Sequence, residues 1–187
     1  MTATIRQATP GDSTSAAKTL AIAFEDYPWT RWSIPAENYP VRLESLQALY
    51  CQHTLNHGLL LVDESGRGAA AALPPHAPEP AETMQSQVAE LHGDRLGALF
   101  STELPPAPDG AWEFATLGVR PTARGAGLGA ALIDAMLALI DSRDSESIVA
   151  LETSDLRNVR LYERHGFVVT ATTAIEDGPT VYSMRRG

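Results

Sequence analysis

The chain shows two hydrophobic periods, and each period predicts a type of secondary structure. Apolar residues alternate with polar ones, or run continuously for a few positions, in strand-like stretches. These stretches are residues 4–8, both arms of 58–75, 111–119, 147–153 and both arms of 167–186. Apolar residues recur at spacings of three and four in helix-like stretches at about 12–24, 37–53, 125–141 and 155–164. This order predicts an α/β (α+β) fold, in which helices lie on the faces of a mixed sheet.

Glycine and proline residues mark the connections between these elements. Ser65-Gly66 suits the tight turn of a hairpin, and Gly166 suits the left-handed position after the last predicted helix. The aromatic stretch DYPWTRWSIP, residues 26–35, is expected to be a loop. Residues 76–110 hold a polar helix between two proline-rich connectors. Because neither flank carries a complete core, we expect one domain, 1–187, with a helical insertion at about 76–110.

The composition indicates a globular protein with an acidic surface. The 187 residues are 44% hydrophobic and 20% charged, and the formal net charge is −9. An acidic surface repels phosphate backbones, which argues against a nucleic-acid partner, and it weakly favours cationic ligands. A single cysteine, Cys51, excludes an intrachain disulfide and fits a reducing compartment. Because no stretch has the length of a signal-peptide core or a membrane span, we expect a cytoplasmic monomer or homodimer without a membrane partner.

A glycine-rich loop, RGAGLG, separates a predicted strand from the helix that follows it. A Walker loop needs Lys-Ser/Thr after its last glycine, but Gly129 precedes two alanines, which excludes that class. A dinucleotide fingerprint fits Gly125, Gly127 and Ala130, but the chain holds a single strand–helix–strand unit. The third alternative is R-x-x-G-x-G, in which backbone N–H groups at a helix N-terminus bind a pyrophosphate. A helix start that simply packs beneath the sheet is the fourth.

A second motif follows at ordinary spacing and favours the pyrophosphate loop. LETSDLRNVRLYERHGF, residues 151–167, comes after LGVRPTARGAGLGAAL, and together they resemble the motifs of GNAT (GCN5-related) N-acetyltransferases. AIAFEDYPWTR, AELHGDRLGAL, AWEFATLGV and GPTVYSMRR extend the similarity nearly end to end, and they resemble puromycin N-acetyltransferase-like members. The resemblance implies the GNAT acyl-CoA N-acyltransferase fold, with a mostly antiparallel sheet, and acetyl-CoA (coenzyme A) as the cofactor.

The resemblance also implies where acetyl-CoA binds. Its pyrophosphate would contact the glycine loop, and Arg124 would add a side-chain cation. Its pantetheine arm would pair with the edge of the preceding strand and contact Asn158, which shares a helical face with Tyr162. The implied cofactor-binding residues are Leu117, Gly118, Val119, Arg124, Gly125, Ala126, Gly127, Leu128, Gly129, Asn158 and Tyr162.

Acetyl transfer to an amine requires a base and an acid. Glu113 and Glu152 are candidate catalytic bases on strands beside the cofactor, where burial would raise a carboxyl pKa toward the working pH. The puromycin enzyme has an aromatic residue at the position of Glu113, so a base and an exposed strand residue stay open as alternatives. The resemblance implies that Tyr162 is the catalytic acid at the leaving sulfur, and the alternative is a core aromatic residue. A backbone N–H around 117–119 would stabilise the oxyanion.

The acceptor side is expected at the aromatic stretch. Tyr27, Trp29 and Trp32 would bind substrate as a lid, as the corresponding loop does in this family, and the alternative is an aromatic cluster that closes the core. No metal is expected, because no glutamate follows His53 in the His53/His57 pair, whose members are spaced as in a metal-binding helix.

Two functions compete on this evidence. The first is an acetyl-CoA-dependent N-acetyltransferase for a primary amine of a small molecule, such as an antibiotic-like compound. The second is a catalytically silent acyl-CoA-binding module that acts as a sensor or partner. Because Tyr162 and the glycine loop are both present, the enzyme is favoured.

Overall fold

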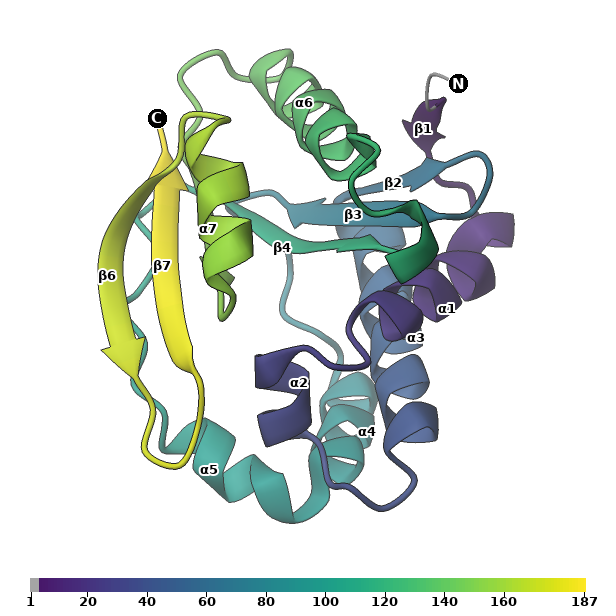
Figure 1. The fold of residues 1–187 in the computed structure, drawn as a ribbon, viewed down its shortest axis with the longest axis vertical. Helices are drawn as coiled ribbons and strands as arrows, with labels where there is room; N and C mark the ends of the chain where they lie inside the picture. The colour runs from purple at the N-terminus through teal and green to yellow at the C-terminus, as the bar shows by residue number, and fades with distance from the viewer. Residues whose placement is uncertain (1–3) are drawn as a thin grey trace.

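The computed structural model describes residues 4–187, and the strands of this range form one seven-stranded sheet (Figure 1). The strand order is β1-β2-β3-β4-β5-β7-β6. Neighbouring strands are antiparallel except β4 and β5, which are parallel. The bounds are β1 Ile5–Gln7, β2 Leu59–Asp63, β3 Gly68–Leu73, β4 Trp112–Val119, β5 Val149–Thr153, β6 Val168–Ala174 and β7 Thr180–Arg186. The mixed, mostly antiparallel sheet is therefore confirmed.

Helices cover both faces of the sheet, which explains why β2 is buried along its whole length. Leu59 and Leu61 belong to the core beneath α6, whereas Leu60 and Val62 belong to the core beneath α1 and α3. The helices are α1 Ser13–Ala23, α2 Pro28–Ser33, α3 Tyr39–His57, α4 Glu82–His92, α5 Leu96–Phe100, α6 Leu128–Asp141 and α7 Leu156–Glu163. Short 3₁₀ turns lie at Pro10–Asp12, Gly93–Arg95 and Pro121–Ala123. No helix in residues 4–187 is long and apolar enough to cross a membrane.

Two expected boundaries are corrected by the structure. The stretch 26–35 is not a loop throughout, because Pro28–Ser33 form α2, with Pro28 at the first helical position, where proline is favoured. The helix expected from Gly125 begins at Leu128 instead, because Gly125 and Gly127 have positive φ angles of 79° and 81°. Residues 125–127 therefore form a non-helical loop directly before the first residue of α6.

The segment 76–110 packs against the helices beside it. The Arg42 guanidinium of α3 donates to the carbonyl oxygens of Glu90 and Leu91 at the end of α4, at 3.0 and 2.8 Å. The buried His92 Nδ1 lies 2.8 Å from the carbonyl oxygen of Ser33 on α2. The expected helical insertion is therefore tied to α2 and α3.

A β-bulge in β4 changes which side chains face each side of the sheet. Ala71 pairs with Thr116 but Leu73 pairs with Glu113, so β4 has one extra residue in between. Before the bulge, Trp112 and Phe114 lie in the core beneath α6 and α7; after it, Leu117 and Val119 pack against the same core. Glu113 and Thr116 therefore both face the opposite side, toward α3.

The parallel pairing of β4 with β5 is short. It consists of Trp112 with Val149 and Glu113 with Ala150. After these residues the two strands diverge, at the same place as the bulge. The fold thus positions an opening in the middle of its sheet.

Gly118 is expected to be required for stability, because α1 packs directly on it. A Cβ there would lie 2.7 Å from Leu20 Cδ2 and 3.0 Å from Ala23 Cβ. We expect Gly118→Ala to lower the free energy of unfolding by about 1–3 kcal/mol, measured by urea denaturation. Gly129→Ala is the control, because its Cβ would meet Leu161 at an ordinary 3.6 Å and alanine favours helix. Equal stability of the two variants would contradict the packing argument.

Candidate active site

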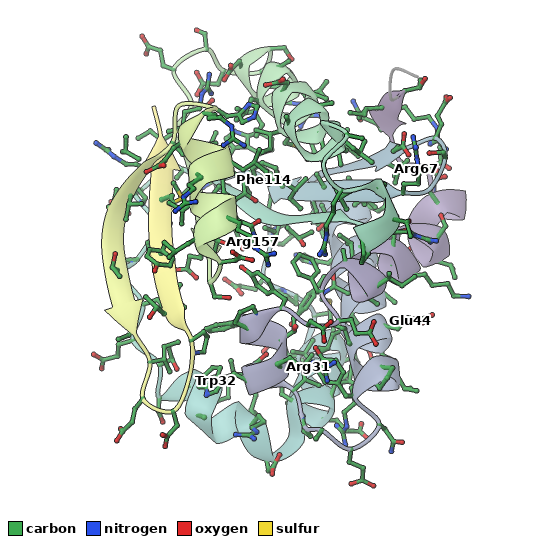
Figure 2. The ribbon with its side chains drawn as sticks, viewed as in Figure 1. Arg31, Trp32, Glu44, Arg67, Phe114 and Arg157 are labelled. Carbon is green, nitrogen blue, oxygen red and sulfur yellow. The ribbon has the colours of Figure 1, made fainter. Side chains whose placement is uncertain are left out.

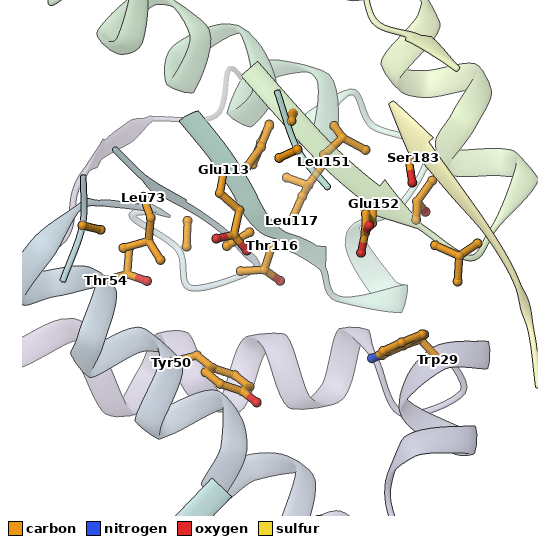
Figure 3. Close-up of a pocket in the computed structure, with 18 of the residues that line it drawn as sticks. Trp29, Tyr50, Thr54, Leu73, Glu113, Thr116, Leu117, Leu151, Glu152 and Ser183 are labelled. Carbon is orange, nitrogen blue, oxygen red and sulfur yellow. The ribbon is translucent and has the colours of Figure 1, made fainter. Parts of the chain in front are cut away.

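A cavity of about 1020 Å³ lies where β4 and β5 diverge (Figure 3). Residues 113–117 of β4 and 150–153 of β5, with Ser154 directly after β5, form one wall of the cavity. Helices α2 and α3 and the proline-rich segments 74–80 and 105–108 form the others. Figure 3 shows Glu113, Thr116 and Glu152 on the sheet side, with Tyr50 and Trp29 on the helices opposite.

The glycine loop has the geometry of a binding loop. Gly125 and Gly127 adopt positive φ angles, and Gly127 is the N-cap of α6. No atom lies within 4 Å of a Cβ built at either glycine, and Arg124 through Gly127 are exposed. N–H groups at a helix N-terminus attract anions, so the chain's own residues fit the pyrophosphate of acetyl-CoA.

Arg124 has a different environment from the one expected. Its Nε donates to the Val119 carbonyl at 3.2 Å, and its Nη2 donates to the Ala23 carbonyl at 2.8 Å. The guanidinium thus joins the end of β4 to the end of α1. Arg124 thus holds the loop in place, and its contact with a pyrophosphate stays a prediction.

The other loop and strand positions divide between backbone and packing roles. Ala126 is exposed beside the glycines, and Leu117 lines the cavity. Leu128 is only 4% exposed and belongs to the core, so its backbone alone is available to a ligand. Gly118 leaves room for α1, which packs directly on it, and the side chain of Val119 lies near Gly129.

Tyr162 is a core aromatic residue that also lines the cavity, and its role as catalytic acid stays a prediction. Its ring packs edge-on against Phe114 and Phe167, with centroids 5.9 and 5.5 Å away. Burial, followed by the nearby Tyr27, raises the pKa of its phenol. Tyr162 is therefore a rigid hydroxyl that keeps its proton at neutral pH. Asn158 also lines the cavity and donates to Thr153 Oγ1 at 3.3 Å.

Glu113 and Glu152 share one face of the sheet. Glu113 pairs with Ala150 in the parallel ladder, and Glu152 lies two residues further along β5. Both residues are exposed, and both line the cavity. Burial raises the pKa of Glu113, with a further contribution from Glu79, and burial and then Glu113 raise the pKa of Glu152. Both carboxyls thus have the direction of pKa shift that a base at neutral pH needs.

The aromatic residues of α2 have separate positions. Tyr27 Oη lies 2.9 Å from Thr153 Oγ1 and accepts from the Ser154 N–H at 2.7 Å. Trp29 also lines the cavity. Trp32 lies outside the cavity lining, because it turns toward the β6–β7 connection beside Gly178 (Figure 2). Of the three residues expected to bind the acceptor, the structure thus brings Tyr27 and Trp29 to the cavity but not Trp32.

The structure adds three lining residues that sequence reasoning missed. Ser154 follows β5, Ser183 lies on β7, and Glu79 lies in the segment after β3. Ser154 stands in the stretch LETS, which belongs to the second motif of the sequence analysis, but Ser183 and Glu79 have no local signal. Their positions depend on strand register and on how the loop packs.

Cys51 and the histidines of α3 show no sign of separate chemistry. Burial raises the pKa of the Cys51 thiol to about 12, so the thiolate is disfavoured. The His53 and His57 rings lie 4.8 Å apart. In residues 4–187, no group of three or more His, Cys, Asp or Glu side chains is arranged to hold a metal ion.

The raised pKa of Glu113 predicts a pH-dependent effect on stability. As pH rises above the ordinary value of 4.5, the unfolded state loses its proton first, so the carboxyl destabilises the fold up to and beyond its raised pKa. We expect Glu113→Gln to leave Tm unchanged near pH 4 and to raise it at pH 7, measured by calorimetry. Glu82→Gln on the exposed start of α4 controls for the lost charge. An equal rise in Tm at both pH values would show that the changed shape of the side chain, and not the protonation of Glu113, causes the effect.

Comparison with known protein families agrees with this geometry. Residues 85–169 match the model of the acetyltransferase (GNAT) domain. The chain is 30% identical over 115 residues to an aminoglycoside N(6')-acetyltransferase type 1 of Klebsiella pneumoniae, covering 56% of this chain and 57% of that protein. It is 37% identical over 86 residues to a mycothiol acetyltransferase of Beutenbergia cavernae, covering 45% and 29%. The chain thus aligns with little more than half, or less, of these relatives.

Solved structures extend the likeness to the whole fold. A histone acetyltransferase HPA2 and related acetyltransferase from Corynebacterium glutamicum superposes with a TM-score of 0.75 at 24% identity, covering 100% of this chain and 96% of that one. Arylalkylamine N-acetyltransferase 2 from Aedes aegypti superposes with a TM-score of 0.70 at 14% identity, covering 100% and 99%. The chain therefore has the fold of these acetyltransferase structures, and residues 85–169 are similar to the GNAT acetyltransferase domain.

Proposed function

We propose that this protein is an acetyl-CoA-dependent N-acetyltransferase that acts on the primary amine of a small, cationic molecule. The observation that carries the proposal is the cavity between the diverging strands. It joins the hydroxyl of Tyr162 to two carboxyls with raised pKa, Glu113 and Glu152, beside an open glycine loop.

The donor side is formed by the chain's backbone. Acetyl-CoA would supply an acetyl group activated as a thioester. The N–H groups at the start of α6 would bind its pyrophosphate, and the open edge of β4 at 114–119 offers main-chain groups to an extended, amide-bearing arm. Asn158, which is held by Thr153, would contact the same arm.

The acceptor side requires loss of a proton from the ammonium group. Glu113 or Glu152 would accept that proton, directly or through a water, since both carboxyls face the cavity and have raised pKa values. Tyr162 would donate a hydrogen bond to the leaving sulfur. Its raised pKa makes complete loss of its proton unfavourable, so we assign it to hydrogen-bond donation.

The relatives support a small-molecule acceptor. Aminoglycosides and arylalkylamines, after which two of the similar proteins are named, carry amino groups on small molecules. An antibiotic-like acceptor, including a puromycin-like compound, falls within this proposal. The acidic surface of the chain, with a net charge of −9, favours approach of a cationic amine.

Release of free thiol from acetyl-CoA across a panel of amines tests the proposal, and Tyr162→Phe tests the mechanism. We expect turnover with at least one amine, and a kcat lower by about 100-fold in the variant with little change in acetyl-CoA affinity. The ring keeps its packing, so melting temperature serves as the control. A variant with full kcat would remove Tyr162 from the reaction, and acetyl-CoA binding without turnover on any amine would favour a sensor.

Gly127→Ala is expected to weaken acetyl-CoA binding. An L-residue at φ 81° costs about 1–2 kcal/mol, and the loop can relieve this strain by changing shape. We expect about a tenfold rise in Kd by calorimetry. Gly66→Ala is a matched control, because Gly66 has φ 68° and equally open surroundings but lies in the β2–β3 turn. Equal affinity in both variants would show that the loop does not bind the cofactor.

A further inference from the structure

We propose that the acceptor is an extended molecule with at least two cationic groups, and that Glu79 selects it by binding the group distant from the reacting amine. This inference rests on the proposed function and concerns the acceptor half of the same cavity. It begins from the charges along the cavity wall and from their order across the sheet.

The cavity is strongly acidic. Among the residues that line it in the described chain, the carboxylates are Glu79, Asp109, Glu113 and Glu152, and the guanidinium is that of Arg185. Two lining histidines, His53 and His92, have pKa values lowered chiefly by burial, so they are neutral at pH 7. The wall therefore carries three more negative than positive charges, the difference between four carboxylates and one guanidinium.

Strand register places two of the carboxylates beside each other. Glu113 lies opposite Ala150, and Glu152 lies two residues along on the same face. Arg185 also pairs with Ala150, from the β7 side, so Ala150 separates its guanidinium from Glu113. Within residues 4–187, Arg185 makes no salt bridge with Glu113 or Glu152 that would neutralise the pair.

Glu79 extends this pair into a row. Its charge acts on Glu113, and the charge of Glu113 acts on Glu152, whereas Glu79 is not among the groups that act on Glu152. Glu79 also acts on His53 of α3, and the Pro78 carbonyl lies against the same ring. Leu73 at the end of β3 pairs with Glu113, and Glu79 lines the cavity in the segment that follows β3. In the strand order β3-β4-β5, this segment therefore begins on the side of Glu113 away from Glu152.

A buried hydroxyl without a partner marks the other end of the row as a ligand site. Ser183 is 8% exposed, lines the cavity and pairs with Glu152 across the β5–β7 ladder. It is close enough to lower the pKa of Glu152 slightly, yet the geometry leaves its Oγ without a hydrogen bond. A buried polar atom without a partner is costly. An amine held between Glu152 and Ser183 would give Ser183 a hydrogen-bond partner and Glu152 a counter-charge.

The walls between the two ends are apolar and aromatic. Trp29 and Tyr50 face the sheet across the cavity (Figure 3). Leu73 and the prolines of 74–80 continue this surface toward Glu79. A hydrocarbon chain with an ammonium at each end matches this distribution, because its methylenes contact the aromatic rings and its cations meet carboxylates.

The test compares three acceptors of similar length: 1,5-diaminopentane, pentylamine and 5-aminopentanoate. Turnover of each is measured as thiol release by the full chain, by Glu79→Gln and by Glu82→Gln. Glu82 is an exposed carboxylate of α4 outside the cavity, so its variant matches the charge change. We expect kcat/KM for the diamine to exceed that for pentylamine by about tenfold or more. Glu79→Gln should remove most of the ratio between the two amines, and Glu82→Gln should leave that ratio unchanged.

Other outcomes separate this inference from the function on which it rests. If pentylamine and the diamine react equally and Glu79→Gln affects neither, the inference is wrong and the transferase stands. A preference for 5-aminopentanoate would also overturn it, and would assign Arg185 to the distal group. If none of the three amines or of the wider panel is acetylated, although calorimetry shows acetyl-CoA binding, the proposed function fails and the inference falls with it.

Discussion

The constraint on which the structure most depends is that the parallel pairing between β4 and β5 stops after two residue pairs. After Glu113 and Ala150 the strands diverge, and backbone groups along one edge of β4 lose the partner that a continuous sheet would give them. The bulge at the same place turns Glu113 and Thr116 to the same face, although they are three residues apart. An opening, an unpaired strand edge and a carboxylate therefore arise from one irregularity, and together they make a place where two ligands can meet.

Contacts on both sides hold this opening in shape. Tyr27, the residue before α2, bonds to Thr153 and Ser154 at and just after the end of β5, and the Trp29 N–H donates to Ser154 Oγ at 3.2 Å. On the other side, Arg124 fastens the glycine loop to the ends of β4 and α1. Because a charged donor makes these last bonds, they are stronger than neutral ones. Arg124, which the sequence analysis expects to contact the pyrophosphate, thus also holds the glycine loop in position.

This difference shows how far the sequence could predict the site. The spacing of hydrophobic residues predicted the position of each described strand. The glycine loop was recognisable because positive φ angles before a helix require glycines, which are visible in the sequence. Glu113 and Glu152 were found because the strands that carry them were found. The partners of Arg124, the direction of Trp32 and the positions of Ser183 and Glu79 were not predictable, since each depends on a contact between segments distant in the chain. The helical turn of α2 was missed because its aromatic residues hide the helical period.

The cavity also shows a conflict between stability and binding. Burial and then the charge of Glu79 raise the pKa of Glu113, and burial and then the charge of Glu113 raise the pKa of Glu152, so the charged forms of both carboxyls destabilise the folded state. Ser183 adds a buried hydroxyl without a partner. A sequence selected for stability alone would place neutral or apolar side chains at these positions, since none of the three contributes to the core. The proposed cationic acceptor would remove the repulsion and give the hydroxyl a partner, so the features that weaken the empty fold would strengthen its complex.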